Sequence, residues 1–218
     1  MTTMPAPLRE VADRNEQHVR EYRTSGLIVL LEDPTTPADT KDAVLAHLAP
    51  WSDAFQRMIS VRVAFETDPQ LKELALQHQQ EEIGHNEILA DSHRTGRSAG
   101  WDPVVEAGAA WFVDQFRTLP GLHRVVLAHL VLEAGSLTFS NAGSLAFPGN
   151  AYFALHDEAD EEHIEMGYRL LTERQEWQLG EVTELLDRSW QIIAMVSDRI
   201  AELALRDTAA PEFNWFLK

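Results

Sequence analysis

The sequence contains no cysteine, and this absence removes several classes of site. Disulfide bonds, thiolate-bound zinc and iron–sulfur clusters all depend on cysteine sulfur. Any metal ion in this protein must therefore be held by histidine and carboxylate side chains. Such ligands suit iron, manganese or zinc.

Lys and Arg residues are also few. The chain has 18 Lys and Arg residues against 35 Asp and Glu residues, which gives a formal net charge of −17 at pH 7. Clustered Lys and Arg are needed to neutralise the phosphates of nucleic acids and to dock on anionic membranes. We therefore expect neither nucleic acid nor a membrane as a partner. Bound metal cations would balance part of the negative charge.

Long apolar runs are missing as well. No stretch approaches the length of a membrane span, and the N-terminal stretch MTTMPAPLREVADR lacks the apolar centre of a signal peptide. A soluble protein with a cytoplasmic location is the resulting expectation. The 218 residues, 44% of them hydrophobic, are enough to bury a full core.

Helical periodicity is present along nearly the whole chain, with little of the β-branched alternation that is typical of strands. Asp68 before Pro69, and Asn150 after a Pro-Gly turn, are typical helix starts. No repeat or long linker divides the chain, so we predict one all-α domain over residues 1–218, a bundle of about seven helices. The expected helices cover 8–24, 40–66, 68–94, 103–117, 122–145, 150–173 and 177–206, and 26–37 is expected to be a break that holds a short strand or a buried connector.

One acidic segment, YFALHDEADEEHIEMG from Tyr152 to Gly167, has the spacing of a metal site. His156, Asp160 and His163 lie at i, i+4 and i+7, which places them on a single helix face. Two imidazoles and a carboxylate in one stripe are suitable ligands for a divalent transition metal. The alternative is a solvated acidic helix with two incidental histidines.

A second segment, QHQQEEIGHNEIL, repeats this spacing with His78, Glu82 and His85. Apolar residues extend the same stripe at both ends, so we expect the stripe to face inward. The pair Glu82 and His85 has the Glu-x-x-His spacing of carboxylate-bridged dimetal sites, and Glu81 is an alternative to Glu82. The other interpretation is a charged outer face with a surface histidine.

Glu133 lies in an otherwise apolar run, VVLAHLVLEAG, with His129 one turn before it. A buried carboxylate is costly unless it is paired, protonated or coordinated. No Lys or Arg occurs between Arg124 and Arg169, which favours coordination over an ion pair. Two metal ions with a bridging carboxylate would use six ligands from three helices and keep open positions for an oxidant or substrate. The proposed ligands are Glu82, His85, Glu133, His156, Asp160 and His163.

These motifs resemble those of a known family, the haem-oxygenase-like dimetal oxidases. YFALHDEADEEH resembles the His-x3-Asp-x2-His segment of that family, and EEIGHNEIL resembles its Glu-Glu-x-Gly-His-type segment. The resemblance spans roughly residues 71–171 and implies a haem-oxygenase-like helical fold. It also implies two Fe(II) ions, with manganese as an alternative, bound by Glu82, His85, Glu133, His156, Asp160 and His163. Glu81, His78 and His129 would be alternative ligands or supporting partners.

The function implied by this resemblance is that of a non-haem diiron oxidase or oxygenase. Such an enzyme uses O2 as co-substrate to oxidise a small organic molecule, here an amino-acid-like or acyl metabolite of specialised metabolism. Apolar neighbourhoods predict a pocket lined by aromatic and aliphatic side chains, with Arg57 or Arg62 as anchor for a substrate carboxylate. The predicted pocket residues are Met58, Phe65, Phe112, Phe116, Phe139 and Phe153.

Three other interpretations stay open. A ferritin-like dimetal bundle would need an extra carboxylate such as Glu66 and would leave His156 unused. A cofactorless quinone-forming oxidase would use the histidines as acids and bases. A non-enzymatic helical interaction protein would use its six tryptophans at a partner surface. Under every interpretation we expect a homodimer through long helices such as 177–206.

Overall fold

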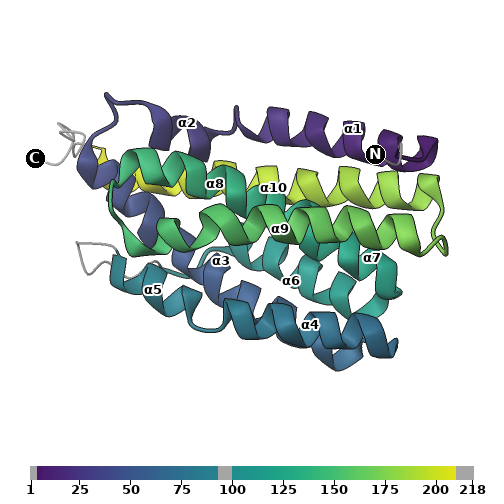
Figure 1. Ribbon diagram of the computed structural model, residues 1–218. Coiled ribbons are helices and arrows are strands. Elements are labelled where there is room, and N and C mark those ends of the chain that lie inside the picture. Colours follow the sequence, from purple (N-terminus) through teal and green to yellow (C-terminus); the bar gives the residue numbers. More distant parts are fainter. Residues whose placement is uncertain (1–3, 93–99, 210–218) are drawn as a thin grey trace, which may run out of the picture.

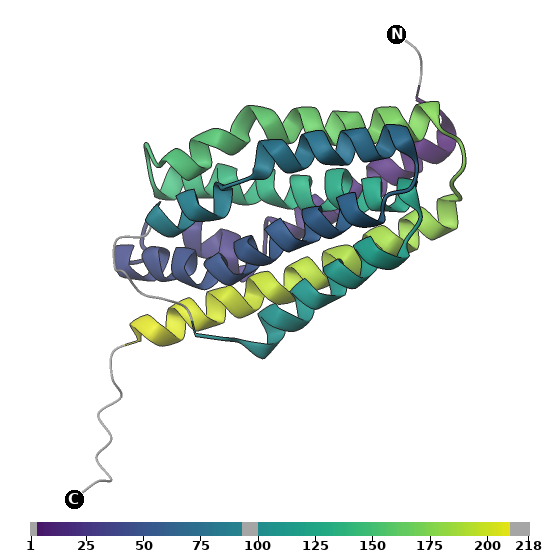
Figure 2. The same cartoon turned by 90° about the horizontal axis from the view of Figure 1, so that it is seen from below.

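The computed structural model describes residues 4–92 and 100–209, except for the side chains of 156–159. This part of the chain is helical, without strands, and its long helices run roughly along one common axis (Figures 1 and 2). The elements are α1 (Ala6–Tyr22), α2 (Gly26–Glu32), α3 (Ala38–Phe65), α4 (Pro69–Glu82), α5 (His85–Ser92), α6 (Pro103–Thr118), α7 (Gly121–Val125), the π-helix η1 (Val126–Leu132), α8 (Glu133–Ala146), α9 (Ala151–Glu173) and α10 (Leu179–Thr208).

The helix starts follow local capping rules. The side chain of Asp68 accepts hydrogen bonds from the backbone N–H groups of Gln70 and Leu71 at the start of α4. Asn150 accepts one from the N–H of Tyr152 at the start of α9. Each cap satisfies backbone donors that have no partner within the helix, and both starts agree with the sequence prediction.

Two boundaries differ from the prediction. The apolar patch within 26–37 forms the short helix α2, not a strand, and it buries Leu27, Ile28 and Leu31 in the core. The helix predicted over 68–94 is divided, because α4 ends at Glu82 and α5 begins at His85. Gly84 forms this turn with a φ of +89°. Glycine adopts this conformation without steric cost because it has no Cβ.

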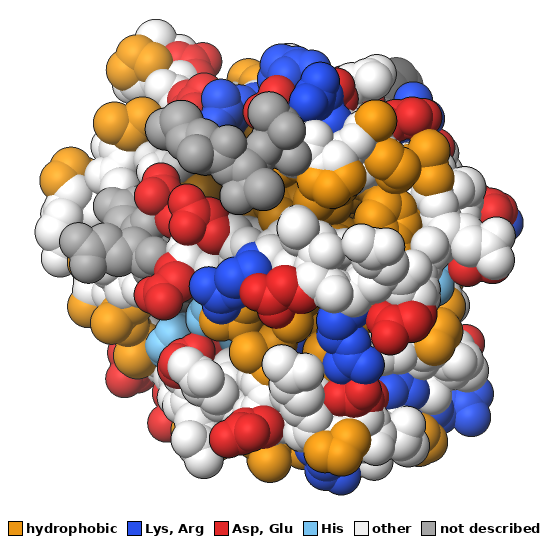
Figure 3. Space-filling view, turned by 45° about the vertical axis from the view of Figure 1, so that its right-hand side comes forward, with side chains coloured by type: hydrophobic (Ala, Val, Ile, Leu, Met, Phe, Trp, Pro, Cys, Tyr) orange, Lys and Arg blue, Asp and Glu red, His pale blue; other side chains and the backbone are white. Residues whose placement is uncertain are grey.

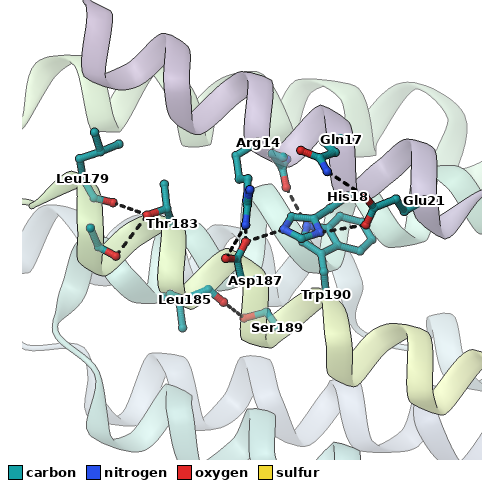
Figure 4. Close-up of polar contacts among 12 residues, drawn as sticks. Arg14, Gln17, His18, Glu21, Leu179, Thr183, Leu185, Asp187, Ser189 and Trp190 are labelled. Carbon is teal, nitrogen blue, oxygen red and sulfur yellow. Dashed lines mark hydrogen bonds and ion pairs between the residues drawn. The ribbon is translucent and has the colours of Figure 1, made fainter.

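The N-terminal and C-terminal helices α1 and α10 lie side by side, and polar contacts join their outer faces (Figure 4). Asp187 on α10 accepts hydrogen bonds from Arg14, at 2.7 Å from both its Nε and its Nη2. The Nε2 of His18 lies 2.7 Å from the same carboxylate, and its ring stacks on Trp190. On the inner side, Trp190 Nε1 donates to Asn15 over 2.8 Å. The apolar stripe of α10 therefore packs inside the bundle. The homodimer stays a prediction.

The centre of the bundle is the rod formed by α7, η1 and α8, which α9 covers along its length (Figure 1). By length and hydropathy alone the rod passes as a membrane span, contrary to the sequence expectation. However, 83% of its most apolar window is buried within the bundle, as in a core helix. The surface differs from this core, since charged side chains of both signs lie among apolar ones on the face shown in Figure 3.

Candidate metal centre

The central rod places Glu133 in the core. The carboxylate is 2% exposed and follows directly on the π-helix η1, in which the backbone turn is wider than in an α-helix. Such π-turns leave carbonyl groups without regular partners and occur frequently at functional sites. Within η1, the carbonyl of Leu130 accepts a hydrogen bond of 2.8 Å from Asn15 Nδ2 on α1. The irregular turn is thus held from the neighbouring helix.

Four buried side chains from three segments converge at this point. His78 and Glu82 come from α4, Glu133 begins α8, and His163 lies on α9. One nitrogen or oxygen atom of each lies within 4.8 Å of the corresponding atom of every other. The convergence depends on close packing of α9 against η1, which the absence of a side chain at Gly167 permits.

Glu133 is the centre of this group. Its Oε1 lies 2.7 Å from Nε2 of His78, and its Oε2 lies 3.4 Å from Nδ1 of His163. Burial alone would raise the pKa of Glu133, but the two imidazoles outweigh it and hold the pKa well below its usual range. The side chain is therefore a carboxylate at neutral pH, with one oxygen directed to each imidazole.

Asp160 lies one turn before His163 on α9 and is fully buried. Neither of its carboxyl oxygens forms a hydrogen bond of regular length and angle among the described residues, although Ser136 and Glu133 are polar neighbours that act on its pKa. Burial, followed by the neighbouring charges of Glu133 and Glu82, raises the pKa of Asp160 to about 9. Buried polar groups without partners are rare and costly in proteins. A buried carboxyl group without a regular hydrogen bond, beside two other acids, fits the role of a cation ligand.

His163 is held from the opposite side by Glu81. Its Nε2–H donates to Glu81 Oε2 over 2.9 Å, so Nδ1 faces Glu133. Burial lowers the pKa of His163, but Glu133 and Glu81 outweigh this and raise it to about 9. Metal-binding histidines usually donate their second N–H to a carboxylate in this way. This geometry favours Glu81 as an orienting partner of His163 over a metal ligand.

His85 contacts Glu82 across the turn between α4 and α5. Its Nδ1–H donates to Glu82 Oε2 over 2.9 Å, and this bond, despite partial burial, raises the pKa of His85. The amide of Gln56 donates to the backbone carbonyl of Glu82 and fixes the end of α4. Glu82 and His85 therefore lie close together, although the turn at Gly84 separates the helices that carry them.

Arg62 on α3 is the buried cation of the site, and the sequence prediction gave it a different role. Its Nη1 donates to His78 Nδ1 and its Nη2 to His129 Nε2, each over 3.0 Å. Burial, and then the charge of Arg62, holds the pKa of His129 well below its usual range. Because Arg62 is 1% exposed and directed to two imidazoles, it is not placed to anchor a substrate carboxylate. Arg62 follows the apolar residue Met58 by one helical turn, and this spacing could have indicated from the sequence that Arg62 is buried.

His156 lies on α9, but its side chain falls outside the described residues. It remains a sequence prediction. The other five predicted ligands, Glu82, His85, Glu133, Asp160 and His163, lie in one neighbourhood, and their role as ligands also stays a prediction. His78, which the prediction placed among the alternatives, is in direct contact with Glu133.

A cavity of about 90 Å³ adjoins the centre, and Glu82, His85 and Glu133 form its acidic side. Of the six predicted pocket residues only Phe139 lines it. Phe65 is 45% exposed, and the others are buried elsewhere in the core, because periodicity does not show which inward-facing residues border a space. The aromatic walls come mainly from Trp51, Phe55, Phe139 and Tyr152.

Charge balance provides a test of whether these residues fit metal ions. Three buried acids lie together, namely Glu82, Glu133 and Asp160. Arg124, a second buried arginine in the described ranges, contacts Glu66 at 3.3 Å, away from this group. Arg62 donates to imidazoles and forms no ion pair within 4 Å with another described residue. The donor set, three carboxyl groups and several imidazoles in one buried neighbourhood, fits divalent transition metals.

The ferritin-like interpretation needs Glu66 as a ligand, and the structure does not provide it. Glu66 Oε1 accepts hydrogen bonds from the backbone N–H groups of Thr67 and Asp68. Its Oε2 is paired with Arg124. Both oxygens are therefore occupied outside the group around Glu133.

Comparison with solved structures identifies the fold. The chain is similar to a TenA homologue from Pseudomonas syringae pv. tomato, with a TM-score of 0.73 and 11% identity over 92% of this chain and 95% of that one. A TenA homologue from Pyrococcus furiosus has a TM-score of 0.70 and 11% identity over 90% and 98% of the two chains. A domain of unknown function with a heme oxygenase-like fold from Shewanella denitrificans has a TM-score of 0.71 and 15% identity over 93% and 94%. The predicted haem-oxygenase-like, all-helical fold is confirmed.

Sequence comparison adds one relative at higher identity. No family model matches the chain. Over 194 residues the chain is 30% identical to the uncharacterized protein RP592 of Rickettsia prowazekii. The matched region covers 87% of this chain and 92% of RP592. The chain therefore belongs to the same family as RP592 and has the haem-oxygenase-like helical fold.

Proposed function

We propose that this protein is a non-haem diiron oxidase or oxygenase that uses O2 to oxidise a small organic substrate. The observation that carries the proposal is the group of buried acids around Glu133. Glu82, Glu133 and Asp160 lie beside His85 and His163, and both oxygens of Asp160 lack a regular hydrogen bond among the described residues. Two cations would neutralise these acids and bind these oxygens.

The candidate ligands are Glu82, His85, Glu133, Asp160, His163 and, from the sequence alone, His156. When bound, ferrous ions would supply the electrons that reduce dioxygen. The chain's own contribution is to fix the ligands before the metal arrives. Glu81 holds His163 through Nε2 and leaves Nδ1 directed inward, and His78 holds one oxygen of Glu133. Ligands fixed in this way need little reorganisation during the reaction.

The cavity beside Glu82, His85 and Glu133 is the proposed substrate site. No Lys or Arg occurs among its described lining residues, so a charged group at the end remote from the acids would be unpaired. An aromatic or aliphatic body fits between Trp51, Phe55 and Phe139, and these apolar walls keep water away from the reacting atoms. This favours a substrate whose apolar part lies in the cavity and whose polar part faces the metal ligands.

Anaerobic loading with Fe(II) tests the proposal. We expect about two iron ions per chain by elemental analysis, because six ligands with a bridging carboxylate suit a pair of ions. Exposure to O2 in a stopped-flow spectrometer should then produce a transient visible absorption band. Its decay should accelerate with a substrate that fits the cavity. Mn(II) loading in parallel tests whether manganese replaces iron.

A matched pair of variants on α4 provides the control. Glu82→Gln should lose at least one iron, whereas Glu73→Gln, which alters an exposed acid on the same helix, should retain both. A wild-type protein that binds no iron under these conditions would contradict the proposal. Turnover of a quinol precursor without iron would instead favour a cofactorless oxidase.

A further inference from the structure

Arg62 has unusual partners for a buried cation. Its side chain is 1% exposed, and buried guanidinium groups normally bind carboxylates. Here Nη1 and Nη2 donate to two imidazoles from different segments, His78 on α4 and His129 in η1. The rings of these histidines lie 5.1 Å apart between centroids, so Arg62 joins α3, α4 and the π-helix at one point.

The chemistry of guanidinium determines the protonation of its partners. An arginine side chain has only donors, so the His78 nitrogen that it contacts must accept. This nitrogen is Nδ1, and the proton of the neutral ring must then be on Nε2. Nε2 lies 2.7 Å from Glu133 Oε1, in position to donate. A metal ion could bind Nε2 only if the proton moved to Nδ1, and Nδ1 cannot carry it while Arg62 donates to that atom.

We propose that Arg62 is a positioning residue that holds His78 in the Nε2–H tautomer. His78 is thereby a hydrogen-bond donor to Glu133 and is excluded as a metal ligand, although one of its ring nitrogens lies within 4.8 Å of atoms of Glu82, Glu133 and His163. The role of His78 beside metal ligands rests on the proposed dimetal function. Within that function, the inference removes one histidine from the set of candidate ligands. It also leaves Oε2 of Glu133 as the oxygen that faces His163.

The same reasoning applies to His129. Its Nε2 accepts from Arg62, so the proton of the neutral ring is on Nδ1. That nitrogen is buried and has no partner among the described residues. His129 therefore has no lone pair free for a metal, and the two histidines bound to Arg62 are both supporting residues.

Histidine NMR of the metal-free protein tests the tautomer directly. In long-range 1H–15N spectra of 15N-histidine-labelled protein, His78 should show a protonated Nε2 and an unprotonated Nδ1. The His78→Gln variant, in which that signal is missing, assigns it. Arg62→Met should give His78 a mixture of tautomers or a doubly protonated ring, whereas Arg57→Met, on the exposed side of α3, should leave the pattern unchanged. A wild-type His78 with its proton on Nδ1 overturns the inference, whatever the variants do.

Loading with Zn(II), which is redox-inert, separates this inference from the proposed function. His78 should keep its Nε2 proton in the loaded wild-type protein. His78→Gln, whose amide can still donate to Glu133, should bind as much zinc as the wild type, and His85→Gln should bind one ion fewer. A metal-type shift at His78, or loss of zinc in His78→Gln alone, contradicts the inference and keeps the metal centre. If no zinc or iron binds, the proposed function fails, and the metal-free spectrum still decides the role of Arg62.

Discussion

Replacing Asp160 by Asn should stabilise the metal-free protein and abolish its stabilisation by metal. Folding the wild-type chain buries a carboxyl group with no regular hydrogen bond among the described residues, and its pKa is raised to about 9. The folded protein must bury a charge or take up a proton at neutral pH, and both cost free energy. Asn removes that cost, and its amide can donate to the neighbouring Glu133. We expect a gain of about 1–3 kcal/mol in the free energy of unfolding.

Thermal melts with and without Fe(II), under anaerobic conditions, measure both halves of this prediction. Each kcal/mol corresponds to roughly 2–4 °C in Tm for a chain of this length. The wild type should gain Tm with iron, by an amount that increases with the logarithm of the iron concentration over its Kd, and Asp160→Asn should not. Asp114→Asn, at an exposed position on α6, should match the wild type in both conditions. A metal-free Asp160→Asn protein that melts below the wild type, and still gains Tm with iron, would show that Asp160 has a structural role instead.

Gly167→Ala should weaken both the fold and the metal centre. A Cβ at this position would lie 2.9 Å from the Cβ of His129 and 2.9 Å from Cδ2 of Leu130, closer than real Cβ contacts. α9 would have to move away from the π-helix and carry His163 away from Glu133. Overpacking of this kind costs about 1–3 kcal/mol. Alanine recovers up to about 1 kcal/mol of this by its better helix propensity.

Urea unfolding measures the loss in stability, and titration of the metal-free protein with Zn(II) or Fe(II) measures the loss in affinity. Gly180→Ala is the matched control, because a Cβ there meets no atom within 4 Å and the residue also lies in a helix. It should leave metal affinity unchanged and stability equal or slightly raised. Equal metal affinity in Gly167→Ala and the wild type would mean that the centre tolerates movement of α9.

The sequence by itself was enough to predict the all-helical fold and to place several of the candidate site residues in the core. Capping residues such as Asp68 and Asn150 act through local hydrogen bonds, so their positions determine where α4 and α9 begin. The apolar run around Glu133 indicated a buried acid, and Glu133 is 2% exposed. Periodicity placed Asp160 and His163 on one face of α9, and both are buried.

The turn at Gly84 shows the limit of periodicity. His78, Glu82 and His85 have the spacing of one continuous helix face, yet α4 ends at Glu82 and His85 belongs to α5. The His85 side chain returns to Glu82 through a hydrogen bond across the turn. Whether a single glycine adopts a positive φ depends on the packing around it. The spacing of His78, Glu82 and His85 in the sequence is the same in both cases.

Tertiary structure alone decided which partner each side chain has. Arg62 is 16 residues from His78 and 67 from His129 along the chain, and only the packing of α3 against α4 and η1 brings it between the two rings. The cavity also depends on tertiary packing, because its lining residues come from helices throughout the bundle. Helical periodicity records which face of a helix avoids water, but it contains no information on which other helix covers that face. The ligand types were therefore readable from the sequence, whereas the protonation of His78 and the space for a substrate depend on contacts between distant segments.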